Sequence, residues 1–514
     1  MIKLDDNKPF YYNLYKNVHF GRRRIILGYD EVTPENVIEV LQKALNIHGG
    51  NRRDCEYLIR YYLGDQDILY RPPAETSTIN NTTVVNYAFP ITREIVGYTL
   101  GNPVELVAKR NEKKEDVQKV NDAYDYEYSY IVDTNAATYA SICGVGYTIT
   151  LPSDEITKDN TPEIPLVNDY LDPRDTFVVQ SNSIGNPQIM SCTIIKRRDG
   201  KRIYICYTDK YKMTVENMVL TNYDINPIGI DPITMWENSL FLTGDWEQAI
   251  SVMNASNIVA SDSLNDIEGT IKSLLVIIGA EFEDGDDTTL KKIKDNRLLE
   301  LNAPGSSNGG GTNVDAKFIS PQLDSTTVQS IRDYLDDARN IITGIPDREN
   351  NANGGDTGTA VLNRNGWTDI EIVAKLKELF IKKAKKKQLA IVLAILKQLD
   401  IIPDNLGVID IDTTIGRHNM DNLSAKTTAF ATLVGTGELA TIDCLELSGL
   451  TNRVAEMVER GKQAKIERQE EAIENAKKAA EATGEGESDN STNGANKTAE
   501  VEKAASGNSD TKNE

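Results

Sequence analysis

The sequence predicts an α+β protein, because helical and strand-like patterns occupy separate parts of the chain. Near the N-terminus, Val37, Val40, Leu41 and Leu45 follow the spacing of one helix face. Residues 135–235 are rich in β-branched side chains and tyrosine and are divided by turn sequences, a pattern typical of a sheet of hairpins. From about residue 245 onward, helical spacing returns. A chain of 514 residues is expected to form about three units.

The N-terminal part, residues 1–244, begins with helices. Helix is predicted over residues 34–63, with Thr33 as N-cap and Pro34 at the first position. The segment NRRDCEYLIRYYLG is predicted as a second helix that ends at Gly64. Turns and short apolar stretches follow, and then come the strands of the hairpin sheet, in segments such as GVGYTITLP, DTFVVQS and KRIYICYTDKYKMTV.

The second half is predicted to be largely helical. A long helix within residues 245–274 precedes a small insert, 275–321, which contains a strand, a short basic helix, a Gly/Ser/Asn loop and another strand. A helix with an apolar stripe that packs on one neighbour follows at 322–343. After a Gly/Asn-rich loop at 344–357, a further helix runs to about residue 399. Short helices are predicted over 401–460, with a turn at Gly435–Gly437, and residues 483–514 have almost no apolar side chains and are expected to be disordered.

Composition excludes several classes of protein. The formal net charge is -22, whereas tight DNA binding without sequence preference usually needs a basic surface. The five cysteines are scattered and are predicted to be reduced thiols. No signal peptide is recognised at the N-terminus, and the longest apolar runs are shorter than the roughly 20 residues of a membrane-spanning helix. We therefore expect a soluble protein inside a cell or a particle.

The sequence contains none of the common motifs for catalysis or cofactor binding. The sequence lacks a P-loop, a G-x-S-x-G elbow, an H-E-x-x-H pair and an EF-hand loop, so no catalytic residues, cofactor or metal site are predicted. The segment GTGELA matches a loose dinucleotide pattern but lies between helix-like sequences, which favours a turn. Asp262 and Asp266, four residues apart, fit a shared cation or, more simply, a polar patch at a subunit interface.

A lysine cluster stands out in so acidic a chain. It is either an exposed helix face or a patch that contacts phosphates without reading bases. A smaller basic group in the insert is equally ambiguous. The first group is Lys375, Lys377, Lys382, Lys383, Lys385, Lys386 and Lys387, and the second is Lys291, Lys292, Lys294 and Arg297.

The segment GIPDRENNANGGDTGTAVLNRNGW, residues 344–367, is least like a packed core. Glycine and asparagine at this density permit left-handed backbone conformations. As a phosphate cradle it lacks a lysine and a preceding strand, and it is too short to link domains freely. A mobile loop aimed at a partner fits the composition and the helices on both sides.

The order of these elements resembles the portal proteins of tailed bacteriophages, in particular the family typical of siphophages of Gram-positive bacteria. The likeness covers roughly residues 50–400 and rests on the order of several weak motifs. RYYLGDQDILYRPP and the following GY-x-x-G-x-P turn are similar to the family's N-terminal signature, LDPRDTFVVQ to its strand entry, and SD-x-x-N-D at Ser261 to its stem helix. TGTAVLNR resembles the start of its tunnel helix, although Thr357 and Val361 replace the usual serine and leucine.

The resemblance implies a portal fold with an α/β wing (1–244), a two-helix stem (245–274 and 322–343), an α/β clip (275–321), a tunnel loop (344–357), a tunnel helix (358–400), a helical crown (401–465) and a charged tail (466–514). It also implies a ring of twelve copies at a capsid vertex of the virion, which is assembled in the host cytoplasm. Double-stranded DNA would pass through the ring.

The implied partners are the terminase large subunit, a head-completion or adaptor protein, and the major capsid and scaffolding proteins. The clip's basic group would dock partners, and the lysine cluster would contact phosphates. The residues facing DNA in the tunnel loop would be Arg348, Asn350, Asn351, Asn353, Gly354, Gly355, Asp356 and Thr357. Two other hypotheses remain open at this point: a nucleotide-dependent DNA-processing enzyme, and a helix-turn-helix DNA-binding protein that uses the turn at Gly435–Gly437.

Overall fold

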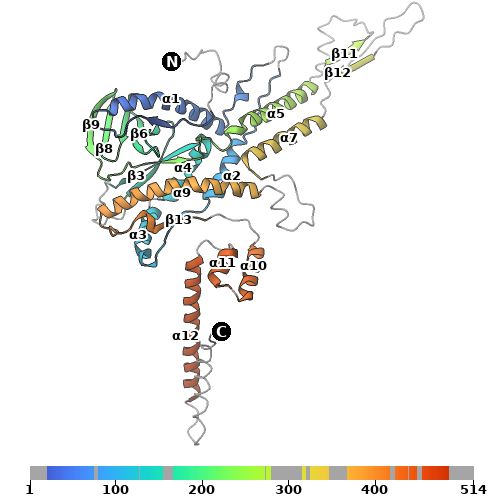
Figure 1. Cartoon of the computed structure of the whole chain (residues 1–514). Helices are drawn as coiled ribbons and strands as arrows, with labels where there is room; N and C mark the ends of the chain where they lie inside the picture. Colours follow the sequence, from blue (N-terminus) through green and yellow to red (C-terminus); the bar gives the residue numbers. More distant parts are fainter. Residues whose placement is uncertain are drawn as a thin grey trace, which may run out of the picture. The chain divides into compact units, whose positions relative to one another are not determined.

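The structure is a computed structural model, and Figure 1 shows the whole chain. It contains two compact units, residues 1–420 and 421–514. The described residues are 20–73, 79–126, 128–153, 166–271, 274–278, 315–319, 325–346, 367–416, 423–437, 439–448 and 454–484.

In the first unit, helix α1 (Val37–Tyr62) packs on a six-stranded sheet. The sheet is mostly antiparallel, and only β1 pairs in parallel, with β5. Val40 and Leu41 of α1 pack on the sheet residues Phe177 and Met190. In spatial order the strands are β1 (Ile25–Leu27), β5 (Thr176–Ser181), β6 (Gln188–Lys196), β7 (Arg202–Tyr207), β8 (Tyr211–Glu216) and β9 (Val219–Ile225).

Helix α1 replaces the two overlapping helices that the sequence predicts. Its first half packs on the sheet, and its second half contributes Tyr57 and Tyr61 to a different core that contains Trp246. Burial at both ends therefore holds the helix continuous through Gly49 and Gly50, whose intrinsic cost is about 1 kcal/mol each. The predicted end is confirmed: Gly64 has φ +95°, and the N–H of Asp65 bonds to the Arg60 carbonyl at 2.9 Å.

A second, three-stranded sheet packs between helices. Its order is β10 (Ile233–Glu237), β3 (Val145–Pro152) and β4 (Leu166–Leu171). Helix α4 (Ser129–Cys143) begins before the region predicted to be strands, residues 135–235, and extends into it. It is helical because it buries Ala136 and Ala140 against Leu100 of α2 (Ala88–Leu100) and against Trp236. Helix α3 (Lys114–Tyr126) contacts α4. Helices α2 and α3 were not predicted from the sequence.

Helix α9 (Trp367–Gln398) lies across this second sheet and contacts β10 and β3. Its C-terminal half enters a core that includes Leu389, Val392 and Leu396. Residues 401–416, predicted as short helices, instead contain a short 3-10 turn (Val408–Asp410) and strand β13 (Ile411–Ile415), which pairs with β2 (Val104–Ala108). The pairing residues are about 300 positions apart in sequence, so local pattern does not reveal them.

Two helices leave the body of the first unit side by side: α5 (Ile250–Ile271) and α7 (Ser325–Thr343) (Figure 1). The predicted strands at both ends of the insert are confirmed, since β11 (Leu274–Ile278) and β12 (Asp315–Ile319) form an antiparallel pair. Leu335 of the predicted α7 stripe is buried, whereas Ile331 and Ile342 are half exposed.

The second unit contains α10 (Leu423–Thr436), α11 (Thr441–Ser448) and α12 (Val454–Gly484). The predicted turn between helices is confirmed, with Gly437 at φ +71°. The disorder expected from residue 483 onward falls almost entirely on 485–514, which lie outside the described residues. In the described ranges, no helix combines the length and the apolar content that crossing a membrane requires.

Candidate functional site

A ladder of polar side chains on α5 holds the extended segment 79–86. Alternate N–H groups of an extended chain point the same way and lie about 6.7 Å apart, close to the 6 Å rise of four helical residues. Side chains of α5 therefore accept the backbone hydrogen bonds that a neighbouring strand would accept in a sheet. The hydrogen bonds run from Asn81 N–H to Asn265 Oδ1 (2.6 Å), from Thr83 N–H to Ser261 Oγ (2.9 Å) and from Val85 N–H to Asn257 Oδ1 (2.7 Å).

This ladder explains the SD-x-x-N-D segment at Ser261 structurally. Asp262 forms an ion pair with Arg71 at 2.6 Å, so this carboxylate is engaged within its own chain. Asp266 also has a partner. Among the described residues, no group of three or more His, Cys, Asp or Glu is placed to hold a metal ion. The sequence signal for this ladder was the spacing of Asn257, Ser261 and Asn265, four residues apart, together with the segment NNTTVVN. Their pairing depends on the tertiary fold.

The start of α5 is fixed by a buried ion pair. Arg22 Nη2 donates to Glu247 Oε1 at 2.6 Å, and both side chains are almost fully buried. Glu247 also accepts the N–H groups of Gly21 and Gly244, at 2.9 and 2.8 Å. A charged carboxylate with three donors is well compensated. These bonds attach residues 21 and 22 to the turn that precedes α5.

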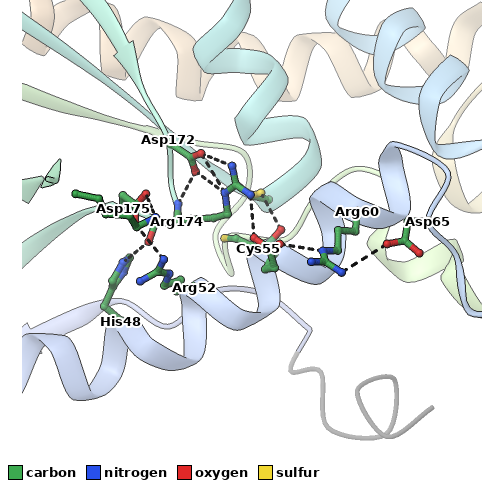
Figure 2. A network of polar contacts seen from close by, with 11 residues as sticks. His48, Arg52, Cys55, Arg60, Asp65, Asp172, Arg174 and Asp175 are labelled. Carbon is green, nitrogen blue, oxygen red and sulfur yellow. Dashed lines mark hydrogen bonds and ion pairs between the residues drawn. The ribbon is translucent and has the colours of Figure 1, made fainter. Parts of the chain in front are cut away.

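A second polar network joins the first sheet to α1, as Figure 2 shows. Arg174 binds Asp172 at 2.6 Å and Glu56 at 2.8 Å, and Arg60 continues the chain of charges to Glu56 at 2.9 Å. Partial burial would raise the pKa of Glu56, but the two arginines outweigh it and lower this pKa. Imidazole Nε2 of His48 lies 3.0 Å from the Arg174 carbonyl, and burial lowers the pKa of His48 to about 4. This network is structural support, since its charges are paired with one another.

The lysines of α9 divide into two groups, and the inward group is structural. Lys385 is buried and pairs with Asp133 at 2.8 Å, where burial raises the pKa of Asp133 although Lys385 opposes the rise. Lys387 donates to Gln188 and to the Ile233 carbonyl, and burial lowers its pKa despite nearby Asp231. The structure therefore corrects the prediction that Lys385 and Lys387 contact phosphates.

Lys377 belongs to the same inward group. Its ammonium lies 2.6 Å from Asp245 and donates to Asn238. These bonds connect α9 to the segment that leads into α5. The inward lysines thus attach the long helix to residues between 133 and 245, a role the sequence could not distinguish from an exposed basic face.

The outward lysines keep exposed ammonium groups. Lys375 and Lys382 lie 3.6 and 2.7 Å from Glu371 and Glu378 one turn earlier, and Lys383 lies 3.0 Å from Glu237. Water screens the lysine end of each pair, so these pairs contribute little stability. Lys386 is exposed as well. Phosphate contact stays a prediction for these four.

The other predicted site residues lie outside the described part of the chain. These are the tunnel-loop residues Arg348, Asn350, Asn351, Asn353, Gly354, Gly355, Asp356 and Thr357, and the basic group Lys291, Lys292, Lys294 and Arg297. The described ranges end at residue 346 before the loop and resume at 367. The five cysteines are free and buried, and burial raises the pKa of Cys143 and Cys192, which suppresses thiolate reactivity.

These features define an α+β protein in which the paired helices α5 and α7 lead to an antiparallel pair of strands, β11 and β12. The family described as phage portal protein, SPP1 Gp6-like, matches residues 41–471, which is most of the chain. The chain belongs to this phage portal protein family, and the portal-type fold expected from the sequence is thereby confirmed. It is a portal protein at a capsid vertex, present in the virion and part of a ring-like oligomer.

Comparison with solved structures gives two similar chains from gene transfer agent (GTA) particles. One is titled "Neck of empty GTA particle computed with C6 symmetry", with TM-score 0.47. The other is titled "Virion of native gene transfer agent (GTA) particle", with TM-score 0.46. In both, identity is 12%, and 77% of this chain and 94% of that chain are covered. No curated protein sequence is significantly similar to this chain.

Proposed function

We propose that the ring is the channel through which double-stranded DNA is packaged and later ejected. The observation that carries this proposal is the family match over residues 41–471. The charge supports it physically. With a formal net charge of -22, the protein would on balance repel a duplex. Because each neutralised phosphate adds affinity, this excess of acidic residues would keep the resistance to sliding low.

The loop at 344–357 is proposed to be the narrowest part of this channel. It follows α7, which packs on α5, and α9, which begins at Trp367, packs in a core of the first unit. Gly354 and Gly355 would supply freedom of movement, Arg348 and the asparagines uncommitted contacts to phosphates, and Asp356 and Thr357 the cap of the following helix.

Twelve copies per ring, and docking of the terminase large subunit, head-completion proteins, capsid and scaffolding proteins, are further proposals. The hairpin at the far end of α5 and α7 supports a docking role for residues 275–321, whose Lys291, Lys292, Lys294 and Arg297 would contact acidic partners. Assembly in the host cytoplasm and an origin among siphophages of Gram-positive bacteria likewise stay predictions.

We also propose that the chain performs no catalysis. The portal family is structural, and the sequence has no P-loop, so a separate motor would hydrolyse ATP. The purified ring should therefore hydrolyse neither ATP nor phosphodiesters. Measurable hydrolysis that co-purifies with the ring and survives further purification would contradict this.

Deletion of residues 350–355 tests the channel proposal. We expect rings to assemble as before, counted in electron micrographs, while the DNA content per particle falls, because the contacts at the constriction are lost. A deletion of equal length at 156–161, which lies in a different part of the chain, serves as the matched control and should leave DNA content unchanged. Normal packaging by the first variant would exclude the loop from the DNA path.

A further inference from the structure

One face of α9 is exposed and mixes apolar with basic side chains. Ile372, Leu376 and Leu379 are between half and two-thirds exposed, and they alternate with lysines at steps of three and four residues. We call Ile372, Lys375, Leu376, Leu379, Lys382 and Lys386 the α9 stripe. The opposite face carries buried Ala374, Ile381 and Ala384, so the stripe is the side turned away from its own core.

On this part of α9, the acidic side chains are largely covered and the basic side chains are exposed. Glu371 accepts a hydrogen bond from Tyr98 of α2, and Glu378 is mostly covered beside Lys382. The lysines at 375, 382 and 386 keep their exposed positions, and Asp369 at the start of the helix is the exposed acid nearest to them in sequence. The outward face is therefore apolar and positive along most of its length.

Helix α7 shows the reverse arrangement. Arg332 donates to Ser263 of α5 at 3.3 Å, and the Arg339 guanidinium lies over the Tyr87 ring at 3.7 Å, so both cations turn toward their own subunit. Its outward face bears Tyr334, Asp337 and Ile341, with Asp333 beside them, which we call the α7 stripe. Tyr334 is 70% and Ile341 is 81% exposed. This face is apolar and negative.

We propose that the α9 stripe of one copy docks on the α7 stripe of the next copy in the ring. A ring closed by head-to-tail contacts needs two different and complementary surfaces on each subunit. The two stripes meet this need, because apolar residues on both would be buried together while lysines on one face aspartates on the other. The inference rests on the ring-like oligomer of the portal family.

DNA phosphates would also attract the lysines, but they would leave the apolar part of the stripe in water. Ile372, Leu376 and Leu379 lie among the lysines on the same face, and exposed apolar patches of this kind mark protein contacts. A protein surface with both apolar and acidic groups satisfies the whole stripe. A second copy of this chain supplies such a surface.

Cross-linking across copies tests the contact. A full-length Tyr334→Cys chain with one affinity tag is co-expressed with a Leu379→Cys chain that carries another tag, and rings are treated with a short bismaleimide. The native cysteines are buried, so the introduced thiols react. We expect a cross-linked dimer that carries both tags. Ile184→Cys, in an exposed turn of the wing, replaces Tyr334→Cys as the matched control and should give none.

Charge reversal provides the second measurement. Lys382→Glu with Lys386→Glu should lower the fraction of chain in rings at least tenfold, and Asp333→Lys with Asp337→Lys in the same chain should restore it. Intact rings without the cross-link, or reversal that lowers DNA content while ring yield is unchanged, would overturn the proposal and leave the portal ring standing. Failure of the unaltered chain to form rings would instead contradict the portal function itself.

Discussion

Replacing Asp133 by Asn tests whether α9 is held to α4 by a buried charge pair. Asp133 and Lys385 are 4% and 3% exposed, and their charged atoms lie 2.8 Å apart. The substitution leaves the Lys385 ammonium buried without its counter-charge. Removing one partner of such a pair typically costs about 3–5 kcal/mol. We expect the lower end, about 3 kcal/mol, because Gln388 still accepts from Lys385 at 2.8 Å and the Tyr124 ring lies 4.4 Å away.

The assay is urea unfolding followed by tryptophan fluorescence. Trp236 is buried beside Ile381 and Ala384 of α9, so it reports on the same contact. Lys43→Gln is the matched control, because its partner Glu39 is exposed and the unfolding midpoint should not change. The double variant Asp133→Leu, Lys385→Met should regain most of the loss, since apolar residues replace such a pair at little cost. An unchanged midpoint for Asp133→Asn would refute the reasoning.

Two further predictions concern the first unit. Gly144→Ala should prevent stable folding, detected as loss of the cooperative fluorescence transition. The reason is that Gly144 has φ +78° and an added Cβ would lie 1.8 Å from the Leu242 carbonyl oxygen. Gly185→Ala, also at positive φ but in open space, is the milder control. Neutral His48 is favoured by folding, since its pKa falls from 6.5 to about 4, so stability is complete above pH 6.5 and is lost as pH decreases toward 4. Between pH 7 and 5 the loss is about 2 kcal/mol, and His48→Gln should remove most of this pH dependence in urea unfolding.

Local pattern predicted the elements whose signals are complete within a short segment. Glycine conformation predicts the end of α1 at Gly64 and the turn at Gly437, and β-branched runs predict the strands at the two ends of the insert. The structure has these elements where expected. Local pattern failed where distant partners decide. Helix α4 contains several β-branched residues yet is helical, because its small side chains Ala136 and Ala140 let it pack closely on Trp236.

The candidate site shows the same division. From the sequence, seven lysines between 375 and 387 form one basic cluster, because composition and spacing carry no information about which side faces the core. The structure separates them: Lys377, Lys385 and Lys387 meet Asp245, Asp133 and Gln188 from segments 132 to 252 residues away.

The sequence by itself determined the order of elements, the acidic balance and the likeness to portal proteins, because these depend on residue types and short spacings. Only the tertiary structure decided that the α5 side chains stand in for a strand beside residues 81–85. It also decided which charges are exposed: burial of an ion is costly unless a partner lies within hydrogen-bond distance, and such partners are brought together by folding and not by proximity in the chain.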